Sequence, residues 1–176
     1  MTKQRLASGT TLAEMPLALW IIIMLCFSLL ILATETIRFG FFWNACREAA
    51  LHAAQCQTFV VDSAVGKSAC NTATSWATLA SSSFSGITIV PPVNVYILQT
   101  DVYAGTTSKS LSRVPLVNAV DTSRNIYDIQ VELNGQIDPL ISFGQSWFGS
   151  VPGLNAPIPV TVHSQYTAEV PQGLNK

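Results

Sequence analysis

One uninterrupted apolar run dominates the hydrophobic pattern of the chain. Residues 15–33 contain no charge, and most of them are Leu, Ile, Ala, Phe or Trp. This is about the length at which an α-helix crosses the roughly 30 Å hydrocarbon core of a bilayer, so the pattern predicts one transmembrane helix. Lys3 and Arg5 precede the run. Their positive charge predicts a cytoplasmic N-terminus and an exported chain from residue 34 onward.

Beyond the run, the pattern takes the period of an amphipathic helix. A cleaved secretory signal is the alternative, but it has a shorter apolar core and needs a small residue where Ile31 stands before Ala33. We therefore expect one continuous helix from about Thr10 to Gln57, about 70 Å long at 1.5 Å per residue. Its apolar stripe comprises Phe39, Phe42, Trp43, Cys46, Ala49, Ala50, Ala53 and Cys56.

The second half of the chain changes to shorter elements. Asp62 and Ser63 are expected to cap a short second helix that folds back on the first, with Val65 and Trp76 on its packed face. From residue 87 on, the stretches "ITIV", "VNVYILQTDVYAG", "IYDIQVELNG" and "PIPVTVHSQYTAEV" alternate polar and apolar residues between Pro, Gly and Asn. The predicted fold class is α+β: a long N-terminal transmembrane and amphipathic helix, a short second helix and a small antiparallel β-sheet. The exported head would comprise residues 58–176.

Composition and charge exclude several functions. The 176 residues carry a formal net charge of -1, with 49% hydrophobic and 11% charged residues and no basic block, so we expect no nucleic-acid partner. "GKS" at residues 66–68 is not a P-loop, because Val61 stands where the first glycine is needed. "GQSWF" around Ser146 lacks the second glycine of a nucleophile elbow.

Candidate ligands and packing residues point away from catalysis as well. His52 and Cys56 share a helix face, but no further pair of metal ligands accompanies them. His163 is expected at a surface or sheet edge, and Trp43, Trp76 and Trp147 are expected to anchor the core. The sequence predicts a protein that is not an enzyme and has no cofactor, metal or small-molecule substrate.

The four cysteines follow the expected topology. Cys26 lies in the apolar run, where it is a small packing residue, and the other three are exported, where oxidation can occur. If the chain turns near Asp62, Cys56 and Cys70 lie at comparable distances from the turn, which predicts a disulfide between them. Pairing of Cys46 with Cys70 is the competing arrangement. Three free thiols are the third, because an odd count leaves at least one cysteine unpaired.

Glu14 raises the main question of the N-terminal region. An acidic side chain near the lipid core costs a few kcal/mol unless it is paired, and no basic residue lies within a helical turn of it. Cleavage after Gly9 would supply the cation, because the new α-amino group of Thr10 would lie about one turn before Glu14. The alternative is that Glu14 only caps the helix at the headgroup level, which contributes at most about 1 kcal/mol and describes a plain anchor.

The combination of a basic leader, Gly9, Glu14 at the fifth mature position and an apolar helix resembles the class III signal of type IV pilins. The closer likeness is to the TadE-like pseudopilins of tight-adherence secretion systems. It rests on "GTTLAEMPLALW", on the continuation "ETIRFGFFWNACREAALHAA" and on the C-terminal "PIPVTVHSQYTAEV". Its specific part covers about the first third of the chain. Met15 and Pro16, directly after Glu14, depart from the commonest form.

The resemblance implies that a prepilin peptidase removes residues 1–9, that the helix over residues 10–57 stays in the inner membrane, and that Glu14 pairs with the N-terminus of its own or a neighbouring subunit. It implies a structural function: a minor pilin or pseudopilin of a tight-adherence pilus or secretion apparatus, with other pilin-like subunits as partners. The competing prediction is a single-span, periplasm-facing domain that binds another envelope component without polymerising.

Overall fold

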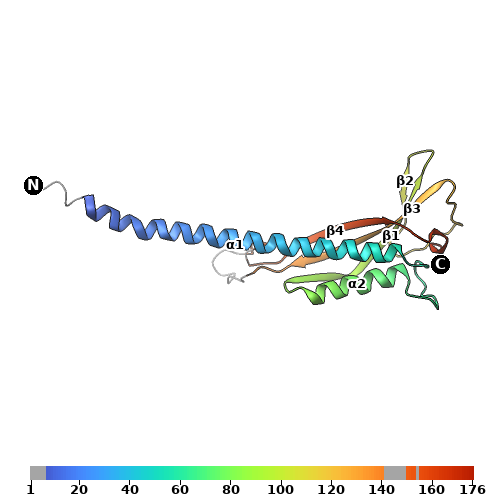
Figure 1. The fold of residues 1–176 in the computed structure, drawn as a ribbon, viewed down its shortest axis with the longest axis horizontal. Helices are drawn as coiled ribbons and strands as arrows, with labels where there is room; N and C mark the ends of the chain where they lie inside the picture. The colour runs from blue at the N-terminus through green and yellow to red at the C-terminus, as the bar shows by residue number, and fades with distance from the viewer. Residues whose placement is uncertain (1–6, 141–149, 154) are drawn as a thin grey trace, which may run out of the picture.

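The protein has an α+β fold, which confirms the predicted fold class. The computed structural model describes the backbone of residues 7–140, 150–153 and 155–176, and the side chains of these residues from 15 onward. In Figure 1 the N-terminal part of α1 projects from one end of the molecule, and its C-terminal part lies against α2 and the sheet. The elements are α1 (Ala7–Ala54), α2 (Ala69–Ser83), β1 (Ile87–Asp101), β2 (Thr107–Lys109), β3 (Asn125–Ile137), β4 (Ile158–Thr167) and a 3-10 helix at Pro171–Gly173.

Helix α1 is continuous over 48 residues, about 70 Å at 1.5 Å per residue. Pro16 lies inside it, and the helix also continues through Gly40. The end comes three residues earlier than the sequence predicts. There the backbone N–H of Cys56 donates to the carbonyl of Ala53 at 3.2 Å in a tighter turn. One rod therefore joins the apolar run to the head.

The start of α2 differs from the prediction. Its N-cap is Ser68, whose hydroxyl accepts from the backbone N–H of Asn71 at 3.4 Å. Asp62, the expected cap, instead accepts from the N–H of Ser68 at 2.7 Å and from the side-chain amide of Asn71 at 2.9 Å. Asp62 thus stabilises the loop before the helix, and Val65 is exposed in that loop rather than packed.

The buried face of α2 consists of small residues. They allow the helix to lie close to α1, whose facing stripe is also rich in alanine. Trp76, which the sequence pattern places on this face, lies at its edge and is 36% exposed. The fully buried α2 residues are Ala69, Cys70, Ala73 and Ala77.

The four strands form one antiparallel sheet in the order β2-β1-β3-β4. The first two predicted strands are a single strand, β1, whose register with β3 shifts between Val90 and Asn94. The shift coincides with Pro91 and Pro92, since proline has no backbone N–H to donate to a neighbouring strand. Strand β2 was not predicted.

The core lies between one face of the sheet and the two helices. Strand residues Val95, Ile129, Val131 and Leu133 are fully buried there. Gly135 permits the closest approach of sheet and helix, because a Cβ at this position would lie 2.6 Å from Cε2 of Phe42. The head is thus packed on the C-terminal part of α1, and the N-terminal part is left uncovered.

Candidate functional site

The residues of the predicted processing and assembly site lie at the start of α1. Gly9, Thr10 and Glu14 all fall within its helical backbone. The side chains of residues 1–14, and with them the predicted pairing of Glu14, lie outside the described residues. The backbone shows that no break separates this region from the apolar run that follows.

Most of the apolar run is exposed, and only Phe27 and Ile31 are half-buried among residues 15–33. Trp20, for example, is 63% exposed, and its neighbours from Leu17 to Leu32 are mostly more than half exposed. Within the part of the chain that the structure describes, α1 is the one helix long and apolar enough to cross a membrane. Soluble proteins rarely expose an apolar patch of this size, which is what a helix able to cross a membrane would present.

The first charges after the apolar run are turned toward the head. The side chains of Glu35 and Arg38 are only 12% and 15% exposed, and their nearest carboxylate and guanidinium atoms are 3.9 Å apart. Arg38 also donates to the backbone carbonyl of Asp138 at the end of β3. Gly86 makes room for it: its φ is +81°, and a Cβ there would lie 2.5 Å from Cζ of Arg38. The helix surface that faces away from the head therefore stays uncharged here.

Cys56 and Cys70 lie where the C-terminal end of α1 meets the start of α2, whereas the thiol of Cys46 faces the carbonyls of Val131 and Val162 in the sheet. All four cysteines of the chain are free thiols in the structure. The thiol of Cys56 donates to the hydroxyl of Thr72 at 3.2 Å, and Cys70 is buried at the start of α2. Burial raises the pKa of Cys70 to about 11 and also raises the pKa of Cys56. The predicted Cys56–Cys70 disulfide is thus not formed here and stays a prediction, as does the Cys46 alternative.

The candidate ligands have ordinary packing contacts. His52 stacks on Trp76 with ring centroids 4.1 Å apart, and Glu48 lies 3.8 Å from its Nε2. Among the described residues, no group of three His, Cys, Asp or Glu side chains lies close enough to hold a metal ion. His163 is exposed on β4, an edge strand, as expected.

Neither of the two described tryptophans that were expected to anchor the core, Trp43 and Trp76, is buried in it. Trp43 is 51% exposed, because it lies on the side of α1 that faces away from the sheet. The core position that the pattern assigned to it is therefore wrong, and Phe42 fills that role with 1% exposure. Trp147 lies outside the described residues.

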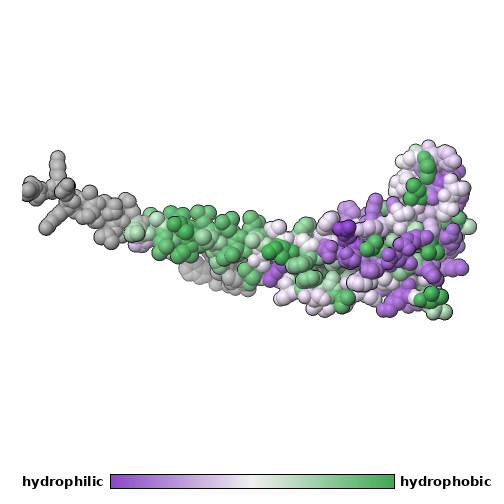
Figure 2. Space-filling model, in the orientation of Figure 1, coloured by the Kyte–Doolittle hydropathy of each residue, from purple (hydrophilic) through white to green (hydrophobic). Residues whose placement is uncertain are grey.

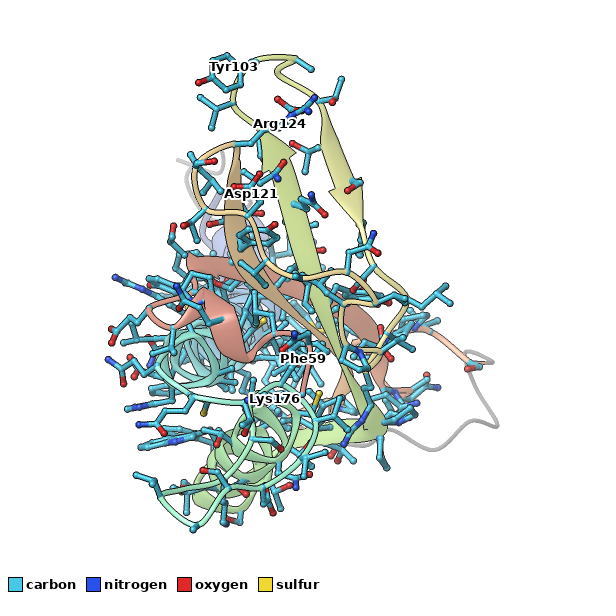
Figure 3. The ribbon with its side chains drawn as sticks, turned by 90° about the vertical axis from the view of Figure 1, so that its right-hand side faces the viewer. Phe59, Tyr103, Asp121, Arg124 and Lys176 are labelled. Carbon is cyan, nitrogen blue, oxygen red and sulfur yellow. The ribbon has the colours of Figure 1, made fainter. Side chains whose placement is uncertain are left out.

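The end of the head farthest from the N-terminus carries a second exposed feature, which Figure 3 views end-on. Tyr103 stands at the tip of the β1–β2 hairpin and is 83% exposed. Asp101 holds the tip by accepting from the backbone N–H groups of Tyr103 and Ala104 at 2.9 and 3.0 Å, and it pairs with Arg124 at 2.9 Å. These hydrogen bonds, that from Ala104 foremost, lower the pKa of Asp101.

Sequence reasoning missed this hairpin because it read residues 93–105 as one strand. Asp101 and Gly105, four residues apart, were the available turn signal. Gly105 has a φ of +64°, which glycine adopts without strain. The tip is therefore a defined turn rather than the end of a strand.

Comparison with known proteins identifies no relative. No protein-family model matches the chain, and neither the curated proteins nor the solved structures contain a match.

Proposed function

We propose that this chain is a structural, membrane-anchored pilin-like subunit, a minor pilin or pseudopilin of the tight-adherence type. One observation carries the proposal: α1 runs without a break from the Gly9–Glu14 region through the exposed apolar run into the core of the head. A helix built this way ties the head rigidly to the part that sits in lipid. A flexible linker would serve a tethered domain equally well, whereas a rod suits a subunit that must stack in register.

The apolar run supports assembly by the same argument. Within the described residues none of its side chains is fully buried, and most are exposed, so this apolar surface calls for cover by lipid or by equivalent helices of other subunits. In a bundle of such helices, Glu14 would be an expensive charge unless a neighbour's α-amino group paired with it. The proposal therefore assigns processing to Gly9 and Thr10, and register to Glu14.

The test removes the carboxylate while keeping the membrane helix. Glu14→Ala should leave membrane insertion unchanged and reduce recovery in cross-linked or sheared pilus-apparatus fractions by about tenfold or more, because a buried amine without a partner costs a few kcal/mol per subunit. Glu48→Ala, a half-exposed carboxylate on the head part of α1, is the matched control and should assemble normally. Equal recovery of wild type and Glu14→Ala would refute the assignment.

Processing is tested separately. Gly9→Val should block cleavage by the prepilin peptidase while leaving the protein in the membrane. N-terminal sequencing should find Thr10 as the first residue of the wild-type protein. An intact Met1 in cells with an active prepilin peptidase would contradict the processing site but not the membrane anchor.

A second candidate function is a single-span anchor whose head binds another envelope component without polymerising. The exposed Tyr103 and its neighbour Val102, which is 57% exposed, favour it, because the Asp101 hydrogen bonds fix them at the tip of the head. Under this alternative, Tyr103→Ser would abolish cross-linking of the head to its partner and Glu14→Ala would not. The proposed assembly function predicts the reverse order of effects.

A further inference from the structure

The exposed, uncharged surface of α1 is longer than the apolar run in the sequence. Residues 15–46 are all described, and within them the two charged side chains, Glu35 and Arg38, are covered by the head. Exposed apolar residues continue past them to Trp43, and the first exposed charge is Arg47. Figure 2 shows the hydrophobic colour of the helix extending onto the near end of the head before polar residues take over. The exposed apolar positions in this extension are Ile37, Phe39, Phe41 and Trp43.

The length of this surface fits a whole bilayer. From Met15 to Trp43 the helix rises about 43 Å at 1.5 Å per residue, whereas residues 15–33 alone rise about 28 Å. A bilayer measures about 30 Å across its hydrocarbon core and about 40–45 Å with its interfaces. The shorter stretch matches the core only, and the longer one matches the full thickness, with Trp43 at the exported interface, where tryptophan is enriched.

The near end of the head, which is the end closest to the N-terminal part of α1, is also apolar. Phe84, at the end of α2, stacks on Phe41 with ring centroids 4.1 Å apart. A crevice of about 240 Å³ opens between α1 and the ends of β3 and β4, lined mainly by Phe39, Ile137, Ile158 and Val160. Leu140 and Val151 are more than a third exposed at this end. These groups stand on α2 and the sheet, so the uncharged surface belongs to the head as well as to the rod.

We propose that the head does not stand clear of the membrane: its near end, together with α1 up to Trp43, sits in the exported lipid interface. The middle of the bilayer then lies near Leu29 rather than near Met24. Glu35 and Arg38 then lie about 9 Å and about 14 Å from the bilayer middle along the helix, inside the hydrocarbon half-thickness of about 15 Å. The head covers both side chains there, Arg38 lies 3.9 Å from Glu35, and Arg38 donates to the carbonyl of Asp138. The inference rests on the membrane anchoring in the proposed function, and not on assembly into a filament.

The experiment measures the depth of single tryptophans in the full-length protein, reconstituted in phosphatidylcholine and phosphatidylglycerol vesicles. Three variants each keep one tryptophan, Trp20, Trp43 or Trp76, with the other tryptophans replaced by Phe. Quenchers are placed on the lipid headgroup, near the top of the acyl chain or near its middle. Trp76 stacks on His52 far along α1 and serves as the control outside the membrane.

We expect the headgroup quencher to reduce Trp43 emission at least twofold more than Trp76 emission. We expect Trp20 emission to be reduced most by the quencher near the top of the acyl chain. The proposal is overturned if Trp43 is quenched no more than Trp76 and if Trp20 is quenched best by the quencher near the middle of the acyl chain. That result would leave the membrane anchor intact. Loss of Trp20 quenching would overturn the anchor itself. Trp43 shielded from both lipid and aqueous quenchers would show that a second copy covers this surface, which also overturns the proposal.

A second reporter covers the case in which a triple replacement fails to fold. The second reporter is Ile37→Trp in a chain whose four native tryptophans are Phe. Residue 37 lies about 12 Å from Leu29 along the helix but about 20 Å from Met24, so it is about 8 Å closer to the bilayer middle if α1 is seated as proposed. It should then respond best to the quencher near the top of the acyl chain. Best quenching from the headgroup would favour the shallower seat and contradict the proposal. Circular dichroism establishes that each variant retains its helix content.

Discussion

The two halves of α1 differ in the size of their side chains, and that difference matches what surrounds each half. Residues 15–33 carry large apolar side chains, mainly Leu, Ile, Met and Trp, most of which are exposed. Residues 45–54 carry a buried stripe of small residues, which face α2 and the sheet: Ala45, Cys46, Ala49, Ala50, Ala53 and Ala54. A helix in lipid needs large apolar surface on every side, whereas a helix packed against another one needs a narrow face that allows close approach.

The largest effect is expected from deleting one aromatic ring in the head half. Phe42→Ala should lower the free energy of unfolding of the head by about 3–5 kcal/mol, because it leaves a cavity between α1 and the sheet. Trp20→Ala, in the membrane half, should leave it unchanged. Denaturant unfolding in detergent micelles, followed by circular dichroism, makes the comparison. Similar losses for both variants would mean that the two halves are not energetically separate.

The cysteines allow a second comparison between the two halves of α1. In protein exported under oxidising conditions, non-reducing peptide mapping should recover Cys56 linked to Cys70, and reduction should then cost about 3 kcal/mol, the value expected for a loop of about 15 residues. Cys26→Ser, in the membrane half, should change neither result. A Cys46–Cys70 peptide would show the wrong pairing, and three free thiols, as the structure has them, would show that no bridge forms.

A smaller effect should follow from enlarging one alanine in each half. Ala49→Leu inserts extra methylene groups into the fully buried stripe and should destabilise the head by about 1–3 kcal/mol. Ala33→Leu adds the same groups to an exposed position and should have no measurable effect on unfolding. If Ala49→Leu were also neutral, close packing of α1 and α2 would not be what holds the head together.

The smallest effect is expected at the loop that follows α1. The hydrogen bond from the backbone N–H of Ser68 is the main reason that the pKa of Asp62 is lowered in the folded protein. Asp62 therefore stabilises the fold fully above its unfolded pKa of about 3.9, and the contribution is lost as the pH falls through the lower folded value. Asp62→Ala should melt slightly below wild type at pH 7, and at the same temperature at low pH. A difference that grows toward acid would contradict this assignment.

The sequence predicts the long helix and the sheet because their patterns are long and regular. Nineteen uncharged residues followed by a helical stripe allow few alternatives, and the alternation in β3 and β4 continues over ten residues or more. Local signals were less reliable. Asp62 has the residue type of a helix cap, yet Ser68 is the cap, because the burial of Ala69 and Cys70 against α1 sets where α2 starts.

Side-chain direction could not be predicted either. Phe42 and Trp43 are adjacent apolar residues on a helix, and only the position of the sheet determines which of them is buried. Likewise, Glu35 and Arg38 appear in the sequence as the charges that end the membrane segment. Only the tertiary structure places Gly86 and Asp138 beside Arg38. These contacts turn the charge toward the head, so the uncharged surface of α1 is longer than the sequence pattern suggests.

The contacts that close the C-terminal end of α1 set an order for folding. The carbonyl of Ala54 accepts from the N–H of Glu169, and the N–H groups of Phe59 and Val60 donate to the carbonyl of Lys176. Figure 3 labels Phe59 and Lys176 at this end of the head. Gly173 fits against the backbone of Gln57 with no room for a side chain. The last described segment thus seals the turn after α1. Residues 169–176 follow every helix and strand that they close, so α1, α2 and the four strands are synthesised before the segment that holds them together. A growing chain can therefore form α1 on its own, but it cannot close the head until residues 169–176 are present.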